Sequence, residues 1–141
     1  FLYDHLFTHF EKEERIENLR GKLMDEVVRI HDIVQQVTDR SIVIMNESFS
    51  STTLQDALYL GREILQQLIQ RDAICVYVTF IDELSVLSEA TVSMVGSIIP
   101  EDPTLRSYKI VRKPADGQAY ALAIANKYGL TYEALRRRIG K

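Results

Sequence analysis

The sequence predicts an α/β domain with a parallel-sheet core, flanking helices, a C-terminal antiparallel edge and terminal helices. Two short apolar runs, SIVIM (residues 41–45) and AICVYVTF (residues 73–80), are typical of strands buried on both faces, as in parallel sheets. Two longer segments place apolar residues at intervals of three and four, which is the spacing of amphipathic helices. Short links between strand, helix and strand then predict a right-handed parallel βαβ unit.

The elements follow one another in a simple order. They are a helix over 19–37, a strand over 41–45, a helix over 54–71, a strand over 73–80, a short helical piece over 82–90, two strands over 91–99 and 106–113 that could pair antiparallel at a sheet edge, and helices over 119–129 and 132–139. Residues 100–105 hold two of the three prolines and predict a turn or loop. Gly129 is a plausible glycine just after a helix, and Thr131 is expected to cap the last helix.

Composition fits one folded domain of ordinary size. The 141 residues are 46% hydrophobic and 26% charged, with a net charge of −3, which disfavours disorder and a uniformly basic nucleic-acid-coating protein. The single cysteine, Cys75, lies in an apolar run and is expected to be a core thiol, so nothing indicates disulfides. The N-terminus has no basic region and no initiator Met, and no apolar stretch approaches the roughly 20 residues of a membrane span. We expect a cytoplasmic chain cut from a longer protein.

Polar residues stand where the predicted strands end. Asn46 and Glu47 follow one strand and Thr79-Phe80 end the next, so these residues should be neighbours at the carboxyl edge of the sheet, where open parallel sheets bind ligands. A carboxylate there can polarise a water for attack on a phosphoryl group, and an Asp before it usually helps to hold Mg²⁺. From the pattern alone, the simpler interpretation of Glu47, a polar residue where a strand leaves the core, is favoured.

Other kinds of site have weak support. None of the six glycines fits G-x-x-x-x-G-K-[ST], so this chain has no phosphate-cradling loop of that type. His5, His9 and His31 are too scattered for a zinc site. The hydroxyl cluster at residues 48–53 lacks a nucleophile elbow, and a helix-turn-helix at residues 119–139 lacks a flanking basic face. The run Arg136-Arg137-Arg138 is expected to face water near the end of a helix rather than to touch nucleic acid.

Taken together, several segments resemble the C-terminal ATPase domain (domain V) of the MutS DNA mismatch repair family, almost without gaps from Phe7 onward. The matching segments are Phe7-Thr8, similar to F-T-R with His9 in place of Arg; Met24 and Glu26, which fall in the F-M-x-E-M part of the signature helix; SIVIMNES, similar to the Walker B strand ending in L-M-D-E; Thr52-Thr53 with Asp56 and Leu58, similar to G-T-S-T-x-D-G-L; VTFIDEL (78–84), similar to A-T-H-Y-x-E-L; and AYALAIANKYGL (119–130), similar to S-Y-G-L-x-V-A-x-x-A-G-(V/L). Each segment is a loose match, but their order and spacing together are specific.

This resemblance implies that residues 1–141 are part of a P-loop NTPase-like, ABC-type ATPase domain, the part after the Walker A segment. Two copies would dimerise head to tail with ATP between them, and DNA would bind through domains outside this chain. The implied roles of the residues are these: Glu47 as general base, Asn46 at the position of the Mg²⁺-associated Asp, Gly21-Lys22 as a helix N-terminus facing the partner's γ-phosphate, Ser51, Thr52 and Thr53 at the dimer interface near nucleotide, and Thr79 in nucleotide binding.

Several positions depart from the family pattern. Asn46 carries no charge, Gly21-Lys22 replace Ser-Thr, and Phe80 replaces a histidine and cannot bind phosphate by a hydrogen bond. In the loop after Glu47, the residues Phe49-Ser50-Ser51 replace G-R-G. The sequence therefore leaves two functions open: a DNA mismatch repair or recombination ATPase whose isolated fragment is inactive, or a degenerate ATPase fold kept as a dimerisation or scaffold module. A fragment of an ABC transporter ATPase is a weaker alternative, because LRGKL is only faintly similar to an LSGGQ segment.

Overall fold

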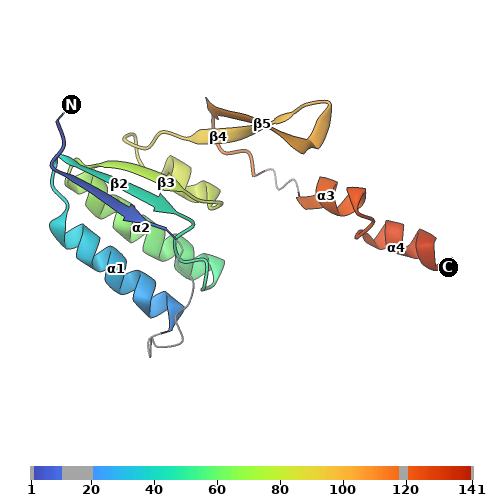
Figure 1. The fold of residues 1–141 in the computed structure, drawn as a ribbon, viewed down its shortest axis with the longest axis horizontal. Helices are drawn as coiled ribbons and strands as arrows, with labels where there is room; N and C mark the ends of the chain where they lie inside the picture. The colour runs from blue at the N-terminus through green and yellow to red at the C-terminus, as the bar shows by residue number, and fades with distance from the viewer. Residues whose placement is uncertain (1, 11–20, 118–120, 141) are drawn as a thin grey trace. The chain divides into compact units, whose positions relative to one another are not determined.

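A computed structural model describes residues 2–10, 21–117 and 121–140, which fall into two compact units, Phe1–Thr91 and Val92–Lys141. The first unit contains β1 (His5–His9), α1 (Lys22–Gln36), β2 (Ser41–Asn46), α2 (Leu54–Gln70), β3 (Ile74–Val78) and the 3₁₀-helix η1 (Asp82–Val86) (Figure 1). The second unit contains β4 (Met94–Ile99), β5 (Asp102–Arg112), α3 (Ala121–Lys127) and α4 (Tyr132–Ile139). Residues 19–20 and 119–120 of the predicted helices lie outside the described ranges.

The first unit contains a three-stranded sheet in the order β1-β2-β3, and all of its pairings are parallel. Val43 in the central strand pairs with Phe7 on one side and with Cys75 on the other. The predicted βαβ unit is thereby confirmed. Hydrophobic periodicity did not predict β1, a five-residue strand that is fastened at its start by Asp4. The Asp4 N–H donates to the Arg40 carbonyl at 2.9 Å, and its carboxylate pairs with the Arg40 guanidinium at 2.8 Å.

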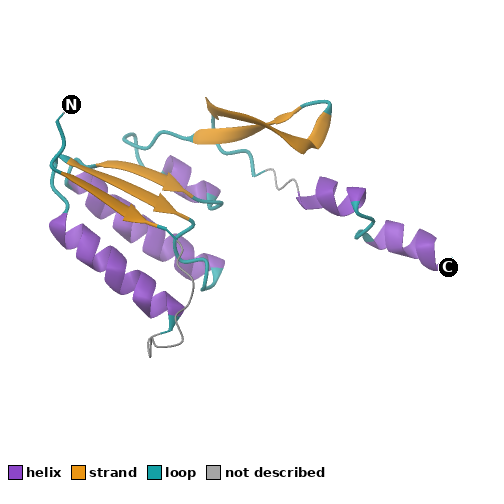
Figure 2. Cartoon of the chain, in the orientation of Figure 1, coloured by secondary structure: helices purple, strands orange, loops and turns teal. Residues whose placement is uncertain are grey.

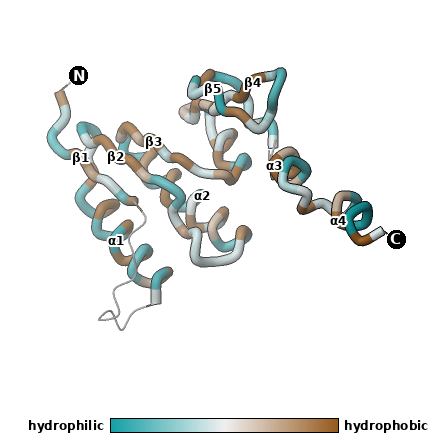
Figure 3. The backbone as a smooth tube through the Cα atoms, turned by 45° about the vertical axis from the view of Figure 1, so that its right-hand side comes forward, coloured by the Kyte–Doolittle hydropathy of each residue, from teal (hydrophilic) through white to brown (hydrophobic). Residues whose placement is uncertain are grey.

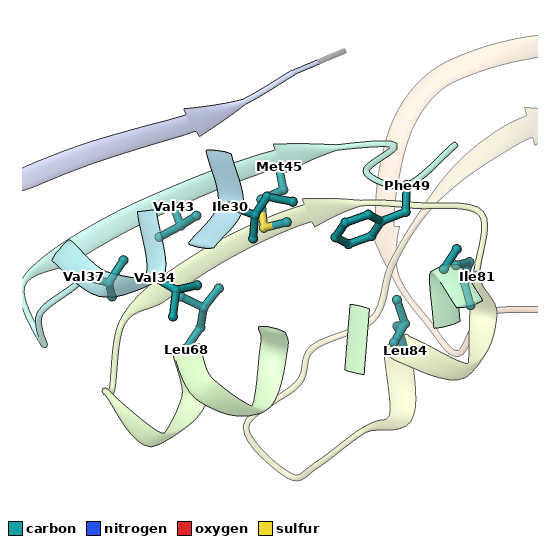
Figure 4. Close-up of a cluster of buried hydrophobic side chains, with 10 residues drawn as sticks. Ile30, Val34, Val37, Val43, Met45, Phe49, Leu68, Ile81 and Leu84 are labelled. Atoms are coloured by element: carbon teal, nitrogen blue, oxygen red, sulfur yellow. The ribbon is translucent and has the colours of Figure 1, made fainter. Parts of the chain in front are cut away.

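Both helices of the first unit cover the same face of the sheet (Figures 1 and 2). The chain adds β1, β2 and β3 in one direction across the sheet, and crossovers of one hand must then place α1 and α2 on one side. Their apolar stripes face the strands and form a single core. Val43 and Met45 come from β2, and they lie with Ile30 of α1 and Leu68 of α2 among side chains that are almost fully buried (Figure 4).

The opposite face of the sheet is not covered by the described residues of the first unit. Ile42 and Ile44 on β2 are half-buried, whereas Ile74, Val76 and Val78 on β3 are 45%, 52% and 51% exposed. Figure 3 shows the apolar residues along these strands. The expectation that the strands are buried on both faces is therefore wrong for this chain, because no described helix of the unit lies on the second face. The continuous apolar runs show that both faces of the strands are hydrophobic, but only one face is covered by helices of this unit, so burial of both faces did not follow.

The second unit is an antiparallel β4–β5 pair followed by two short helices. The antiparallel pairing is confirmed, but the two strands form a separate two-stranded sheet, so an edge of the parallel sheet was the wrong place for them. Strand β5 begins at Asp102, inside the predicted loop, because the reversal needs only the residues around Pro100 and Glu101. Gly129 lies two residues after the end of α3 and has a φ of 67°, as predicted for a glycine after a helix.

The last helix, α4, differs from its prediction at the first turn. Thr131 occupies the N-cap position of α4, but its side chain makes no capping hydrogen bond. In the described ranges, no helix combines the length and the apolar character that a membrane crossing requires.

Packing of α2 on the sheet can be tested by truncating Leu68, which is 1% exposed. We expect Leu68→Ala to lower the free energy of unfolding by about 2–5 kcal/mol, because it removes buried methyl groups and leaves a cavity. Urea unfolding followed by circular dichroism measures the change. Gln66→Ala on the same helix is the control, since Gln66 is exposed and its truncation should alter stability by less than about 0.5 kcal/mol. Equal losses for the two variants would contradict this packing.

Candidate functional site

Glu47 is the first residue after the central strand, at the carboxyl edge of the parallel sheet. Its N–H donates to the carbonyl of Val78 at 2.8 Å, which extends the pairing with β3 by one residue beyond β2. Its φ of 47° lies in the left-handed region, so the chain leaves the strand direction at this residue. The side chain is exposed. A carboxylate therefore stands at the end of β2, where the sequence predicted it.

The carboxyl ends of the other two strands lie beside Glu47. His9, the last residue of β1, pairs with Met45, and Val78, the last residue of β3, pairs with Asn46. Thr79 follows directly, so the predicted neighbourhood of Asn46-Glu47 and Thr79 is confirmed. The Thr79 hydroxyl accepts a hydrogen bond from the Ile81 N–H at 3.1 Å, which shapes the turn into η1. Phe80 is 65% exposed and does not contribute to the core.

A buried polar cluster that was not predicted from the sequence lies at this edge. His9 is 0% exposed and Ser48 is 5% exposed, and His9 Nδ1 lies 3.1 Å from Ser48 Oγ. Burial raises the pKa of Tyr77 to about 12, and its interaction with the Ser48 hydroxyl opposes part of that rise. The Tyr77 hydroxyl makes no hydrogen bond of standard geometry to a described residue, so Ser48 is its polar neighbour rather than a full partner. No sequence signal marked Ser48, because it follows the turn at Glu47 and lies outside the alternation of β2, whose buried positions are Ser41, Val43 and Met45.

Glu26 joins α1 to the loop after β2. This glutamate is 4% exposed, and its Oε2 accepts a hydrogen bond from the Ser51 hydroxyl at 3.3 Å. Gly21 precedes the helix in an extended conformation, and Lys22 is its first residue, so the predicted start of this helix is close to the observed one. Because Glu26 is only about one turn from Lys22, the Glu26–Ser51 contact brings the start of α1 and the loop at 50–53 to the same end of the unit.

The other hydroxyls of this loop serve the start of α2. Thr53 is the N-cap residue and accepts from the Asp56 N–H at 3.2 Å, while the Thr52 hydroxyl donates to the Asp56 carboxylate at 3.2 Å. Helix capping accounts for both residues. Ser51, Thr52 and Thr53, which the resemblance assigned to the dimer interface near nucleotide, thus all have partners within the unit. To donate to a phosphate, Ser51 and Thr52 would have to give up the carboxylates that they now bind, whereas Thr53 only accepts and can still donate.

Asn46 is the weakest part of the site as a cation ligand. Its half-buried side chain offers one neutral carbonyl oxygen, whereas Mg²⁺ in proteins is usually held by one or two carboxylates together with phosphates and water. Among the residues that the structure describes, no three His, Cys, Asp or Glu side chains group closely enough to hold a metal ion. The residues present therefore fit a strongly bound Mg²⁺ poorly.

The fold and the edge define an α/β protein of the parallel-sheet class, with a carboxylate at the end of its central strand. The family model for MutS domain V matches residues 1–138, and the chain belongs to this family. A curated relative, Endonuclease MutS2 of Thermomicrobium roseum, is 26% identical over 134 residues, which cover 94% of this chain and 17% of that protein. The chain thus spans about a sixth of the length of the relative that it matches.

The positive φ of Glu47 predicts an unusual response to glycine. A side chain in the left-handed region costs roughly 1–2 kcal/mol, which glycine does not incur. We expect Glu47→Val to be less stable than Glu47→Gly by about 1 kcal/mol or more in urea unfolding. At Asp39, an exposed turn residue without a positive φ, the same pair should show no such preference for glycine. A valine variant at 47 as stable as the glycine variant would contradict the observed backbone.

Cys75 should react slowly in the folded protein. Burial raises the pKa of its thiol from 9.0 to about 11, so folding favours the neutral thiol, and the thiolate is the reactive form. At pH 8 we expect alkylation by iodoacetamide to be at least about 100-fold slower in the native than in the urea-unfolded protein. By the same linkage, stability from this group is complete below pH 9 and falls as the pH rises above it. Alkylation is followed by mass spectrometry. Rates for the native and unfolded protein within threefold of each other would refute the raised pKa of Cys75.

Proposed function

We propose that this chain is part of the ATPase domain of a MutS-like protein that couples ATP binding and hydrolysis at a dimer interface to DNA binding in mismatch repair or recombination. The single observation that supports it best is the exposed Glu47 carboxylate at the carboxyl end of the central strand. Membership of the MutS domain V family supports the rest. The dimer, the DNA contact made by other domains and a cytoplasmic location belong to this proposal.

Glu47 is the general base of the proposed reaction. Its carboxylate accepts a proton from the attacking water as that water adds to the terminal phosphoryl group of the nucleotide. The backbone of Glu47 is fixed by its hydrogen bond to Val78 and by its left-handed conformation. The side chain is exposed, which leaves room for water and substrate. The nucleotide supplies the phosphoryl group and the leaving group. We derive no step through Mg²⁺, because the described residues fit that ion poorly.

The remaining predicted residues have a binding role in this proposal. Gly21 and Lys22 place a helix N-terminus and an ammonium where a partner's γ-phosphate would approach, and both attract anions. Ser51, Thr52 and Thr53 would contribute hydroxyls at the dimer interface, and Thr79 would act beside the phosphates. Ser51 and Thr52 already donate their hydroxyl hydrogens within the unit, so their contribution to affinity should be smaller than that of free donors. Thr53 and Thr79 only accept hydrogen bonds, so their hydroxyls can still donate to a phosphate.

The hydrogen bonds that the loop hydroxyls make within the unit also support a second function. A degenerate ATPase fold that serves as a dimerisation or scaffold module would need no strong Mg²⁺ ligand at Asn46 and could keep its loop hydroxyls for internal structure. In that case the protein that contains this domain binds ATP whether or not Mg²⁺ is present, and it does not hydrolyse it. The ATPase proposal instead expects turnover that requires Mg²⁺. Titration of ATP with and without Mg²⁺ separates the two functions.

Turnover should depend on Glu47 and on chain beyond these 141 residues. In the MutS-type protein that contains this domain with a phosphate-binding loop, we expect Glu47→Gln to lower kcat by about 100-fold or more, because the amide cannot accept the proton. Glu63→Gln on the exposed side of α2 is the charge-matched control and should keep wild-type turnover. The 141-residue chain alone should not hydrolyse ATP. Turnover by this chain that vanished on Glu47→Gln would refute the requirement for further chain.

A further inference from the structure

The turn after β2 is fixed at three consecutive residues, each by a different part of the unit. The Glu47 N–H binds the Val78 carbonyl of β3, the Ser48 hydroxyl contacts His9 of β1, and the Phe49 ring is 1% exposed in the core. Both Glu47 and Phe49 have positive φ, at 47° and 66°. Such a turn keeps its shape only where its surroundings hold it, since these conformations are unfavourable for residues with side chains.

The His9–Ser48 contact is a side-chain link of this turn to β1, beside the Tyr77 interaction on the β3 side. It joins residues 39 positions apart, at 3.1 Å, and both residues are buried. Breaking a buried hydrogen bond is costly, because a substitution that removes one partner leaves the polar atom of the other buried and unsatisfied. Its place is also specific: His9 ends β1 opposite Met45, and Ser48 comes directly after Glu47. Glu47 is therefore held to β3 by its own backbone hydrogen bond, and the next residue is held to β1 by its side chain.

We propose that His9 and Ser48 are positioning residues for Glu47, because their hydrogen bond holds the turn that aims its carboxylate. This inference rests on the proposed function of Glu47 as general base. Ser48 is buried and Glu47 is exposed in successive positions, so a movement of the Ser48 backbone after loss of this contact would also turn the peptide that joins the two residues. Misplacement of a catalytic group by about 1 Å can lower a rate by roughly 100-fold.

The atoms in the contact determine which substitutions preserve it. The histidine uses Nδ1, the ring nitrogen closest to the backbone, and an asparagine amide places a polar atom at a similar distance from Cα, whereas glutamine extends one bond further. His9→Asn should therefore retain the link, and His9→Gln should lose most of it. A residue needed only for bulk in the core would show the reverse order, since glutamine is closer to histidine in size.

The kinetic test uses the MutS-type protein that contains this domain. We expect Ser48→Ala and His9→Gln each to lower kcat by roughly 10- to 100-fold with KM for ATP within about threefold of wild type. The double variant should be no worse than either single one, because both break the same link, and His9→Asn should restore most of kcat. Ser41→Ala is the matched control: Ser41 is also fully buried on β2 but bonds to Thr38 at the other end of the strand, so its kcat should stay at the wild-type value.

A second measurement does not depend on turnover. In the 141-residue chain, Ser48→Ala should speed hydrogen exchange of the Glu47 amide by about tenfold or more while leaving exchange in the middle of α1 unchanged; Ser41→Ala should not affect the Glu47 amide. Faster exchange throughout the unit, or none at Glu47, would overturn the positioning role. Additive losses in the double variant, or equal losses for Ser41→Ala, would also overturn it. Wild-type protein without turnover would refute the proposed function, and the exchange result alone would then decide whether the link fixes the turn.

Discussion

The hydrogen bond from the Glu47 N–H to the Val78 carbonyl, at 2.8 Å, is the contact on which the candidate site depends. It carries the β2–β3 pairing one residue past the strand and holds Glu47 while its backbone turns into the left-handed region. The parallel sheet supplies the direction, because all three strands end at the same edge. The carboxylate can stand at that edge only while the backbone beneath it stays paired with β3.

The polar interactions around Glu47 are buried or partly buried, while the carboxylate itself is exposed. His9 contacts Ser48, Tyr77 interacts with Ser48 and Glu26, and Glu26 accepts a hydrogen bond from Ser51 in the loop after β2. Buried polar contacts of this kind contribute little net stability but penalise every alternative arrangement that would leave them unpaired. They are suited to fixing one loop conformation. The core beneath, built around Val43 and Met45, supplies the hydrophobic stabilisation.

Sequence reasoning predicted the elements whose patterns are long and local. The helix predicted over 54–71 is observed at Leu54–Gln70, and the strand over 41–45 extends by only one residue. Strand β1 was not predicted by periodicity because five residues carry little pattern, and its pairing with β2 decides its conformation. The open sheet face and the separate β4–β5 sheet were also missed. Both depend on which segments pack together, and a single sequence does not contain that information locally.

The same distinction applies to the site. The position of Glu47 at the strand end followed from an apolar run that stops, which is a local signal. The His9–Ser48 contact joins residues 39 positions apart and could not be predicted. The resemblance assigns the loop hydroxyls to a dimer interface near nucleotide, and that role stays a prediction. Within the unit they cap α2 or bind Glu26, because short polar side chains readily satisfy nearby backbone and carboxylate groups.

The most direct measurement is a crystal structure of the MutS-type protein that contains this domain, with a non-hydrolysable ATP analogue bound. We expect a Glu47 carboxylate oxygen within about 3.2 Å of a water that faces the terminal phosphorus. A carboxylate that points away from the nucleotide, with another residue holding that water, would contradict it.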